Sequence, residues 1–361
     1  MKWITVVCPI FFIISVYGQN EWKNYKPQLF TKPLAYAALR TEKKISVDGI
    51  LSESDWQNAS WSNAFADIEG EAKPKPVFNT KIKMLWDDTC LYVAAQLEEP
   101  NLNANLHQHD TLLFLDNNFE VFLDPDNDTH NYFELEVNAL NTIFDLFMTK
   151  PYRNSGNALI SYNVQGLQSA VKLHGTLNNS EDTDSGWTVE LAIPFRALHF
   201  GSKQNSTPAA GSFYRINFSR VEWNWNVIHD HYVKGKDSAG HVLPEHNWVW
   251  SPQGVINMHY PERWGYVFFS KNSADKYTIP ITEEVKNYLW LVYYKQHDYY
   301  KTNNMYAKNL AVLKMAATMK IANRLYRLSL TTLAEKFIAV ISEEDSKQQL
   351  SIDQDGKVEK E

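Results

Sequence analysis

Cysteine is scarce in this chain, which has two cysteines, Cys8 and Cys90, among 361 residues. Cys8 lies in an N-terminal apolar run that we expect to be removed, so no intramolecular disulfide is expected and the core must hold by packing. Long basic runs are also missing and the net charge is −7, which argues against a nucleic-acid partner. Beyond the N-terminal run, no apolar stretch reaches membrane-spanning length, and we expect no membrane span.

The first 18 residues have the pattern of a secretory signal peptide. Lys2 precedes an apolar run from Val6 to Val16, and Val16 and Gly18 have the spacing of a cleavage site. We therefore predict cleavage near Gly18 and a secreted or periplasmic protein, and the sequence does not distinguish between these two locations.

The residues between 44 and 270 form short strand-like runs separated by Gly, Pro, Asn and Asp. This pattern is typical of a β-sandwich and differs from the strand–helix alternation of a parallel sheet. Residues 19–43 read as an extended lead-in. The prediction is an all-β fold, an antiparallel β-sandwich over 44–270, with a small C-terminal α+β appendage over 275–361.

The appendage is predicted from a change in pattern after Ser270. Residues 282–300 place apolar and aromatic groups at helical spacing, with Glu283 and Glu284 in the first turn. Strands are expected over 336–341 and 350–358, the second of which contains an Asp355-Gly356 turn. The residues of this appendage indicate no function.

Several predicted strands alternate apolar and polar side chains, so one sheet face is expected to be polar. Phe119, Val121 and Leu123 face the core, which leaves Glu120 opposite. The expected outward groups on the neighbouring strands are Glu134, Glu136, Asn138, Arg215, Asn217 and Ser219.

Seven segments resemble, in the same order, segments of family 9 carbohydrate-binding modules and their DOMON-like relatives. They are VDGILSESDW (47–56), WDDTCLYVAAQLEEP (86–100), FEVFLDPD (119–126), ELEVNAL (134–140), GWTVELAIP (186–194), RINFSRVE (215–222) and WSPQGVINMHYPERWG (250–265). The resemblance implies non-catalytic binding of a polysaccharide or oligosaccharide, in support of extracytoplasmic polysaccharide breakdown by partner glycoside hydrolases.

The resemblance also implies a site in which two Trp rings sandwich a terminal sugar. A carboxylate, an arginine and an amide bind its hydroxyls. The carboxylate matches Glu120 and the first ring matches Phe114, but Glu136 stands at the arginine and Met258 at the second ring. The predicted carbohydrate-binding residues, with aromatic groups of the 220–260 loops added, are Phe114, Glu120, Glu136, Asn138, Trp223, Trp225, Met258 and His259.

The altered positions leave other functions open. A structural or protein-interaction module that has lost the sugar site is the main alternative, and burial of Trp223, Trp225 and Trp248 would favour it. Catalysis is not expected, because a glycosidase pair made of Glu120 and Glu136 would need two different environments to divide their pKa values.

Cofactors are not expected, although three groups of residues suggest one. Asp124, Asp126 and Asp128 form an acidic loop suited to calcium, for which a plain Asp-Pro turn is the competing interpretation. A DOMON-like haem site is a third hypothesis for function and would pair Met148 with one of three histidines, His229, His231 or His241. The run His229-Asp230-His231 also suggests a metal site, against a polar loop.

Overall fold

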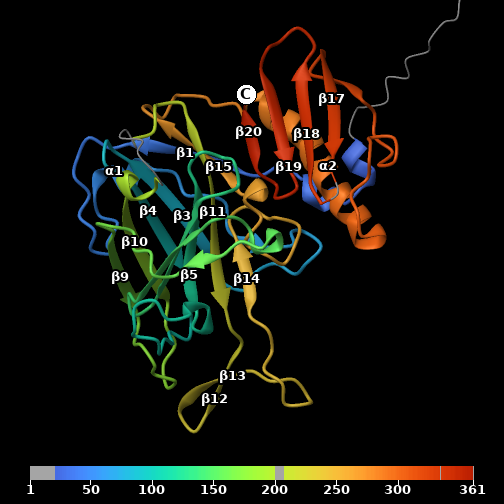
Figure 1. The fold of residues 1–361 in the computed structure, drawn as a ribbon. Coiled ribbons are helices and arrows are strands. Elements are labelled where there is room, and N and C mark those ends of the chain that lie inside the picture. Colours follow the sequence, from blue (N-terminus) through green and yellow to red (C-terminus); the bar gives the residue numbers. More distant parts are fainter. Residues whose placement is uncertain (1–20, 200–206, 334, 361) are drawn as a thin grey trace, which may run out of the picture. The chain divides into compact units, whose positions relative to one another are not determined.

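The computed structural model describes residues 21–199, 207–333 and 335–360 (Figure 1). The predicted signal peptide lies outside these residues. The chain divides into two compact units, one over Lys26–Ile279 and one that joins the residues up to Tyr25 with Pro280–Glu361. Within the described ranges, no helix has the length and apolar character needed to cross a membrane.

The larger unit is built on a sheet of thirteen strands. The strands are β1 (Ala35–Arg40), β2 (Ala66–Asp67), β3 (Thr80–Trp86), β4 (Cys90–Leu97), β5 (Asn118–Asp124), β6 (Tyr132–Asn138), β7 (Ile143–Met148), β8 (Ala158–Leu159), β9 (Gln168–His174), β10 (Gly186–Pro194), β11 (Phe213–Glu222), β14 (His246–Val249) and β15 (Gly265–Ser270). Their order is β8-β7-β6-β5-β11-β15-β1-β3-β4-β10-β9, with β14 and β2 paired in turn beside β11. The all-β prediction is therefore confirmed.

The sheet differs from the prediction in one respect. Sequence reasoning expected antiparallel pairing throughout, but β1 runs parallel to both of its neighbours, β15 and β3. Because β1 joins the two halves of the sheet, the hydrogen-bonded path stays continuous as the sheet curls over one core. That core takes side chains from both halves, including Val93 and Leu191 on one side and Val121 and Phe218 on the other.

Short helices and a hairpin complete this unit. The helices are α1 (Ser54–Asn58), η2 (Pro27–Phe30), η3 (Leu113–Leu115), η4 (Tyr152–Asn154), η5 (Phe195–Ala197) and η6 (Pro261–Arg263). The hairpin of β12 (Trp225–Ile228) and β13 (His231–Lys234) forms a separate two-stranded sheet that projects beyond the end of β14 (Figure 1).

The second face of the β5–β6–β11 region was expected to be open to solvent, and this expectation is wrong. Arg215, Asn217 and Ser219 do leave β11 on the face opposite Ile216 and Phe218, but all three are buried. A second apolar cluster joins strand side chains of this face to loop residues that cover it, and it includes Phe122, Tyr132, Phe144, Leu146, Met148, Val249, Met258 and Trp264. The alternation of apolar and polar residues predicts the correct face, but its burial is decided by the covering loops.

Glu190 fixes the N-terminal turn of the larger unit to β10. Its carboxylate accepts hydrogen bonds from the Trp56 indole at 2.8 Å and from the backbone amides of Asp48 and Gly49 at 3.0 Å each. Gly49 has a φ of +80° and a side chain there would meet the Lys172 backbone, so glycine is required. The VDGILSESDW segment therefore has a structural role, and we call its three hydrogen bonds to Glu190 the Glu190 clasp.

The smaller unit packs one helix, α2 (Ile281–Asn303), on a five-stranded antiparallel sheet. The strands are β16 (Thr318–Ile321), β17 (Arg324–Thr332), β18 (Phe337–Glu343), β19 (Gln349–Asp353) and β20 (Val358–Lys360), in that order. The predicted helix is present, and Gly356, with a φ of +77°, lies in the turn between β19 and β20. The 3-10 helix η1 (Glu21–Asn24) belongs to this unit, where Trp22 contacts the ring of Tyr288.

Candidate carbohydrate-binding site

Glu120 lies in a row of side chains that crosses four neighbouring strands. The register places Ser219 of β11 beside Glu120 of β5, Glu120 beside Glu136 of β6, and Glu136 beside Phe144 of β7. Asn118, two residues before Glu120 on the same face, donates from Nδ2 to Glu120 Oε1 at 3.2 Å and to Glu136 Oε2 at 2.6 Å. One amide therefore holds the two carboxyl groups together.

Burial controls the charge of Glu120, Glu134 and Glu136, which we call the carboxyl row. It raises the pKa of Glu120 from 4.5 to about 7, and the hydrogen bond from Asn118 opposes this shift. Burial, with the charge of Glu120 added, raises the pKa of Glu134 to about 8. The pKa of Glu136 also lies well above its usual value, first through burial and then through the charges of Glu120 and Glu134. At pH 7 Glu134 is therefore mostly protonated and Glu120 about half protonated, so the row can both donate and accept hydrogen bonds.

His259 and Met258 close the other end of this face. The imidazole Nδ1 of His259 lies 2.9 Å from the Tyr132 hydroxyl, and Nε2 lies 3.8 Å from Glu134 Oε2. Burial lowers the pKa of His259 to about 4, so it is neutral at pH 7. Met258 is buried, and its sulfur accepts a hydrogen bond from Gln253 Nε2. Both residues lie in the cover over the carboxyl row, on the side of Glu134.

Three aromatic side chains gather near the start of β5, and we call them the aromatic lip: Phe114, Trp223 and Trp225. The Trp223 indole donates to the Phe114 carbonyl at 2.8 Å, and the Trp225 indole donates to Asn117 Oδ1 at 3.2 Å. Asn117 Oδ1 also accepts the Trp223 backbone amide at 2.9 Å. Phe114 is 37% exposed, Trp225 is half-buried and Trp223 is buried. Asn117 therefore accepts hydrogen bonds from two residues of the lip. The next residue, Asn118, donates hydrogen bonds to two residues of the carboxyl row.

Lys234 and Glu245 connect the lip to Glu120 electrostatically. The Lys234 ammonium lies 3.2 Å from the centroid of the Trp223 ring and 5.9 Å from that of Trp225. The pKa of Lys234 is lowered by burial, and the charge of Glu245 acts against this shift. The same Glu245 charge adds to the rise in the pKa of Glu120. A lysine, an aromatic lip and a pair of carboxyl groups therefore share one local field.

A family model described as "Carbohydrate family 9 binding domain-like" matches residues 47–242, which is more than half of the chain. The chain belongs to this family. The matched residues include the carboxyl row, the aromatic lip and the Glu190 clasp, so the resemblance seen in the sequence is confirmed.

Two curated relatives match this family 9 module over a shorter stretch. "Exoglucanase XynX" from Acetivibrio thermocellus and "Endo-1,4-beta-xylanase A" from Thermoanaerobacterium saccharolyticum are each 32% identical to it over 119 residues. The matches cover 32% of this chain but only 9% and 8% of the two relatives.

Two solved structures are similar to the module. Both are of a family 9 carbohydrate-binding module from Caldicellulosiruptor kristjanssonii, one in complex with glucose and one in complex with cellotriose. Each is 17% identical, and the TM-scores are 0.40 and 0.39. The matches cover 67% and 68% of this chain, and 98% and 99% of the solved chains.

Asn138 takes up a different position in this network. Its Nδ2 donates to the Leu106 carbonyl at 2.8 Å and to Asp116 Oδ2 at 3.1 Å, and its Oδ1 accepts the amides of Leu140 and Thr142. Asn138 therefore anchors loops at the edge of the row, and its contact with a sugar stays a prediction. Sequence reasoning missed Asn117 and Lys234, because neither follows the strand alternation. Asn118 could have been found, since it shares the parity of Glu120.

The other predicted groups lie apart from this row. Trp248 is buried against Arg220 in the main core and does not extend the lip. Met148 is fully buried in the second cluster, whereas His229, His231 and His241 are exposed on and after the hairpin. His229 and Asp230 have φ values of 49° and 61° and form the two-residue turn of the hairpin, which agrees with the polar-loop interpretation.

The acidic loop after β5 brings the oxygens of Asp124, Asp126 and Asp128 within 4.8 Å of one another. Both carboxylate oxygens of Asp124 accept backbone amides, from Asn127 at 3.0 Å and from Thr129 at 2.9 Å. This is the hydrogen bonding of a tight turn, and calcium binding there stays a prediction.

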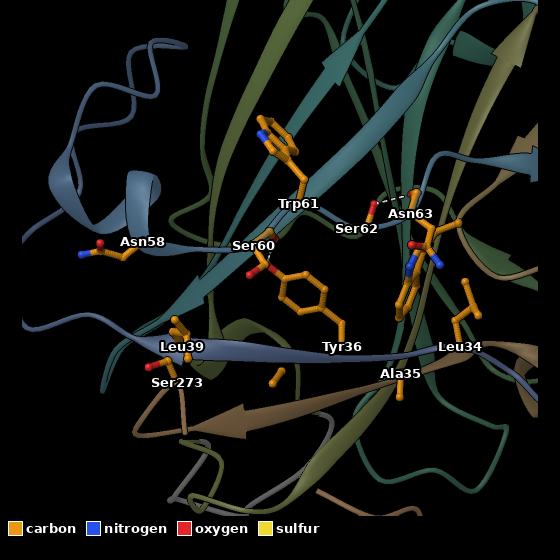
Figure 2. A pocket seen from close by; sticks show the side chains of 12 residues that line it. Leu34, Ala35, Tyr36, Leu39, Asn58, Ser60, Trp61, Ser62, Asn63 and Ser273 are labelled. Carbon is orange, nitrogen blue, oxygen red and sulfur yellow. Dashed lines mark hydrogen bonds between the residues drawn. The ribbon is translucent and has the colours of Figure 1, made fainter. Parts of the chain in front are cut away.

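A separate hollow of about 300 Å³ lies between β1 and residues 58–63. Figure 2 shows the Tyr36 ring reaching from β1 toward Ser60, whose carbonyl accepts its hydroxyl at 2.6 Å, while Trp61 points away from Tyr36. The lining includes neither Glu120 nor Phe114. Trp61 is 36% exposed and so provides a comparison tryptophan outside the candidate site.

Proposed function

We propose that this family 9 module binds carbohydrate at the aromatic lip and the carboxyl row. The observation that carries this proposal is the pair Asn117 and Asn118, because consecutive residues hold the partly exposed aromatic lip and the buried carboxyl groups. Phe114 and Trp225 would stack on the C–H face of a sugar ring, and Glu120 with Glu136 would bind hydroxyls. Met258 and His259 would shape the far end of the site.

The ligand we propose is the end of a neutral β-1,4-linked glucan or xylan chain. The curated relatives are an exoglucanase and a xylanase by name, and a family 9 module has been solved with glucose and with cellotriose. The role of the chain would then be to hold polysaccharide for partner glycoside hydrolases outside the cytoplasm. We expect it to catalyse no reaction. Burial raises the pKa of both Glu120 and Glu136, whereas a glycosidase pair needs one protonated and one ionised carboxyl group.

Isothermal titration calorimetry with cello- and xylo-oligosaccharides tests this proposal. We expect Phe114→Ala and Trp225→Ala each to weaken binding by about tenfold, the loss expected for about 1.4 kcal/mol of stacking. Trp61→Ala removes an exposed tryptophan elsewhere and should leave the affinity unchanged. Equal losses in all three variants, or unchanged affinity in the lip variants, would contradict the proposed site.

A protein-interaction module is the second candidate function. Exposed apolar side chains beside the lip favour it: Leu112, Leu115, Val227 and Ile228. If the folded chain binds no glycan of either type, the sugar proposal fails. This second function is then supported if the lip variants abolish capture of a hydrolase that the unchanged chain retains.

A further inference from the structure

Three potential metal ligands converge at the edge strand region of the larger unit, away from the carboxyl row. His109 Nε2 lies 3.3 Å from Asp110 Oδ1 and 3.6 Å from Asp145 Oδ1. All three ligand atoms lie within 4.8 Å of one another. The Asn163 Oδ1 atom also faces His109 Nε2, at 2.7 Å. One imidazole nitrogen and two carboxylate oxygens thus converge, and the Asn163 amide oxygen lies at hydrogen-bond distance from the imidazole.

Two of these oxygens are buried without a hydrogen-bond donor. Asp110 Oδ1 and Asp145 Oδ1 are both inaccessible to water, and neither has a hydrogen-bond partner among the described residues. Asp145 is 98% buried. An unpaired carboxylate oxygen in such a place costs free energy, so a cation between the two oxygens would remove a penalty that the fold otherwise carries.

Protonation of His109 would not satisfy the two aspartate oxygens. The Nε2 hydrogen would be donated to Asn163 Oδ1, and Asp110 Oδ1 and Asp145 Oδ1 would still accept no hydrogen bond. A metal ion in place of that proton would bind His109 Nε2 and both aspartate oxygens at once, and the Asn163 amide oxygen, now at hydrogen-bond distance from Nε2, would move aside. Zinc bonds of about 2.0–2.2 Å at tetrahedral angles hold neighbouring ligand atoms about 3.3–3.6 Å apart, which matches the two His–Asp distances.

The backbone already holds these ligands in place. The Asp110 amide donates to the Ile143 carbonyl at 3.2 Å, which ties the His109 loop to the start of β7. The Val164 amide donates to Asp145 Oδ2, which ties the Asn163 loop to the same strand. Asp145 therefore uses one oxygen to position its neighbour and leaves the other facing His109. Such outer contacts are what orient metal ligands in proteins.

The cluster is distinct from the candidate sugar site. Asp145 pairs with Leu135 of the main core, whereas Glu136 pairs with Phe144 on the other face of the sheet. The two groups therefore leave β6 and β7 on opposite sides. His109 is about half exposed, which gives an ion a path from solvent.

We propose that His109, Asp110 and Asp145 bind a divalent transition-metal ion beside Asn163. The imidazole nitrogen selects against calcium and magnesium, which prefer oxygen ligands alone, and suits zinc. The ion would join the His109 loop to β7. Cys90 is a free thiol and is the one cysteine among the described residues, so a bound metal ion would cross-link segments that no disulfide joins there.

Calorimetric titration of metal-free protein with Zn²⁺ tests the site, and the variants are His109→Gln and Asp145→Asn. We expect one equivalent to bind, with a rise in the melting temperature, and each variant to weaken binding by at least about 100-fold. Asn at 145 can still accept the Val164 amide, and His109 is half exposed, so both variants should fold. The matched control is His241→Gln, which removes an exposed histidine 3.3 Å from a single aspartate, Asp237.

Further measurements separate this site from nonspecific binding. Co²⁺ should give the intense visible absorption of a tetrahedral site, absent in His109→Gln, and an equal concentration of Ca²⁺ should not displace Zn²⁺. Binding that His241→Gln removes, binding that all variants keep, or no binding at all would each overturn the proposal. Oligosaccharide affinity tests the candidate sugar site separately, so the two proposals can fail independently of each other.

Discussion

Glu120, Glu134 and Glu136 are all buried. The hydrogen bonds and charges of the described residues around them do not fully replace the hydration that their ionised forms lose. Burial is the largest cause of the raised pKa of each residue. The folded protein therefore keeps protons that the unfolded chain releases once the pH exceeds about 4.5. Because the folded state binds more protons, stability is expected to fall as pH rises from there to about 8, where Glu134 ionises.

Glu120→Gln tests this pH dependence at a single residue. The amide resembles a protonated carboxyl group and cannot ionise, so the variant should lose less stability than the unchanged chain between pH 5 and pH 8, by about 1.4 kcal/mol for each pH unit over which a proton was held. Urea denaturation at a series of pH values measures the effect. Glu42→Gln, at an exposed position, should keep the original profile. A profile for Glu120→Gln parallel to that of the unchanged chain would show that Glu120 does not titrate in this range.

Among the elements, β11 is tied to the opposite half of the sheet by a buried arginine. Arg220 of β11 donates to Glu222 and to Glu99, both at 2.8–2.9 Å, and to Thr80 of β3 at 3.1 Å. Its guanidinium also donates to the Glu98 carbonyl, which follows β4, at 2.7 Å. The pKa of Glu222 is raised well above its usual value by burial, and the Arg220 charge acts against that shift. This network bridges the core that the curled sheet encloses.

Arg220→Ala would leave two buried carboxylates without their cation. We expect a loss of about 3–5 kcal/mol in the free energy of unfolding, measured by urea denaturation. Arg40→Ala breaks an exposed pair with Asp88 and should change stability little. Similar losses in the two variants would mean that the Arg220 network does not link the two halves of the sheet.

At the scale of the whole molecule, the N-terminal segment and the C-terminal appendage form one unit. Trp22 contacts the Tyr288 ring with centroids 4.8 Å apart, and the Tyr25 hydroxyl donates to Asp298 of α2. The predicted lead-in over residues 19–43 is therefore divided by the fold at Tyr25. Apolar spacing indicated α2 in the sequence, but no local pattern indicates a partner more than 250 residues away.

Trp22→Ala tests this long-range closure. Removal of a buried tryptophan side chain should destabilise the smaller unit by about 3–5 kcal/mol. Hydrogen exchange would show faster exchange in α2 and unchanged exchange in β5, β6 and β11. Trp61→Ala, at an exposed tryptophan of the larger unit, is the control. Faster exchange in β5 after Trp22→Ala would contradict the division into two units.

The sequence by itself determined the class of fold, the strand faces and the family. Alternation put Glu120 and Glu136 on one face, and turn residues marked the strand ends, because strand periodicity and turn conformation depend on near neighbours. The same local reasoning gave α2 and the turn at Gly356.

Only the tertiary structure decided what surrounds those residues. It placed Met258 and Trp264 over a face that was expected to be open to solvent, and it made β1 parallel to its neighbours. It also brought His109 to Asp145 across 36 residues. Burial and ligand convergence depend on contacts between distant segments, and the free energy of those contacts has no local signature in the sequence.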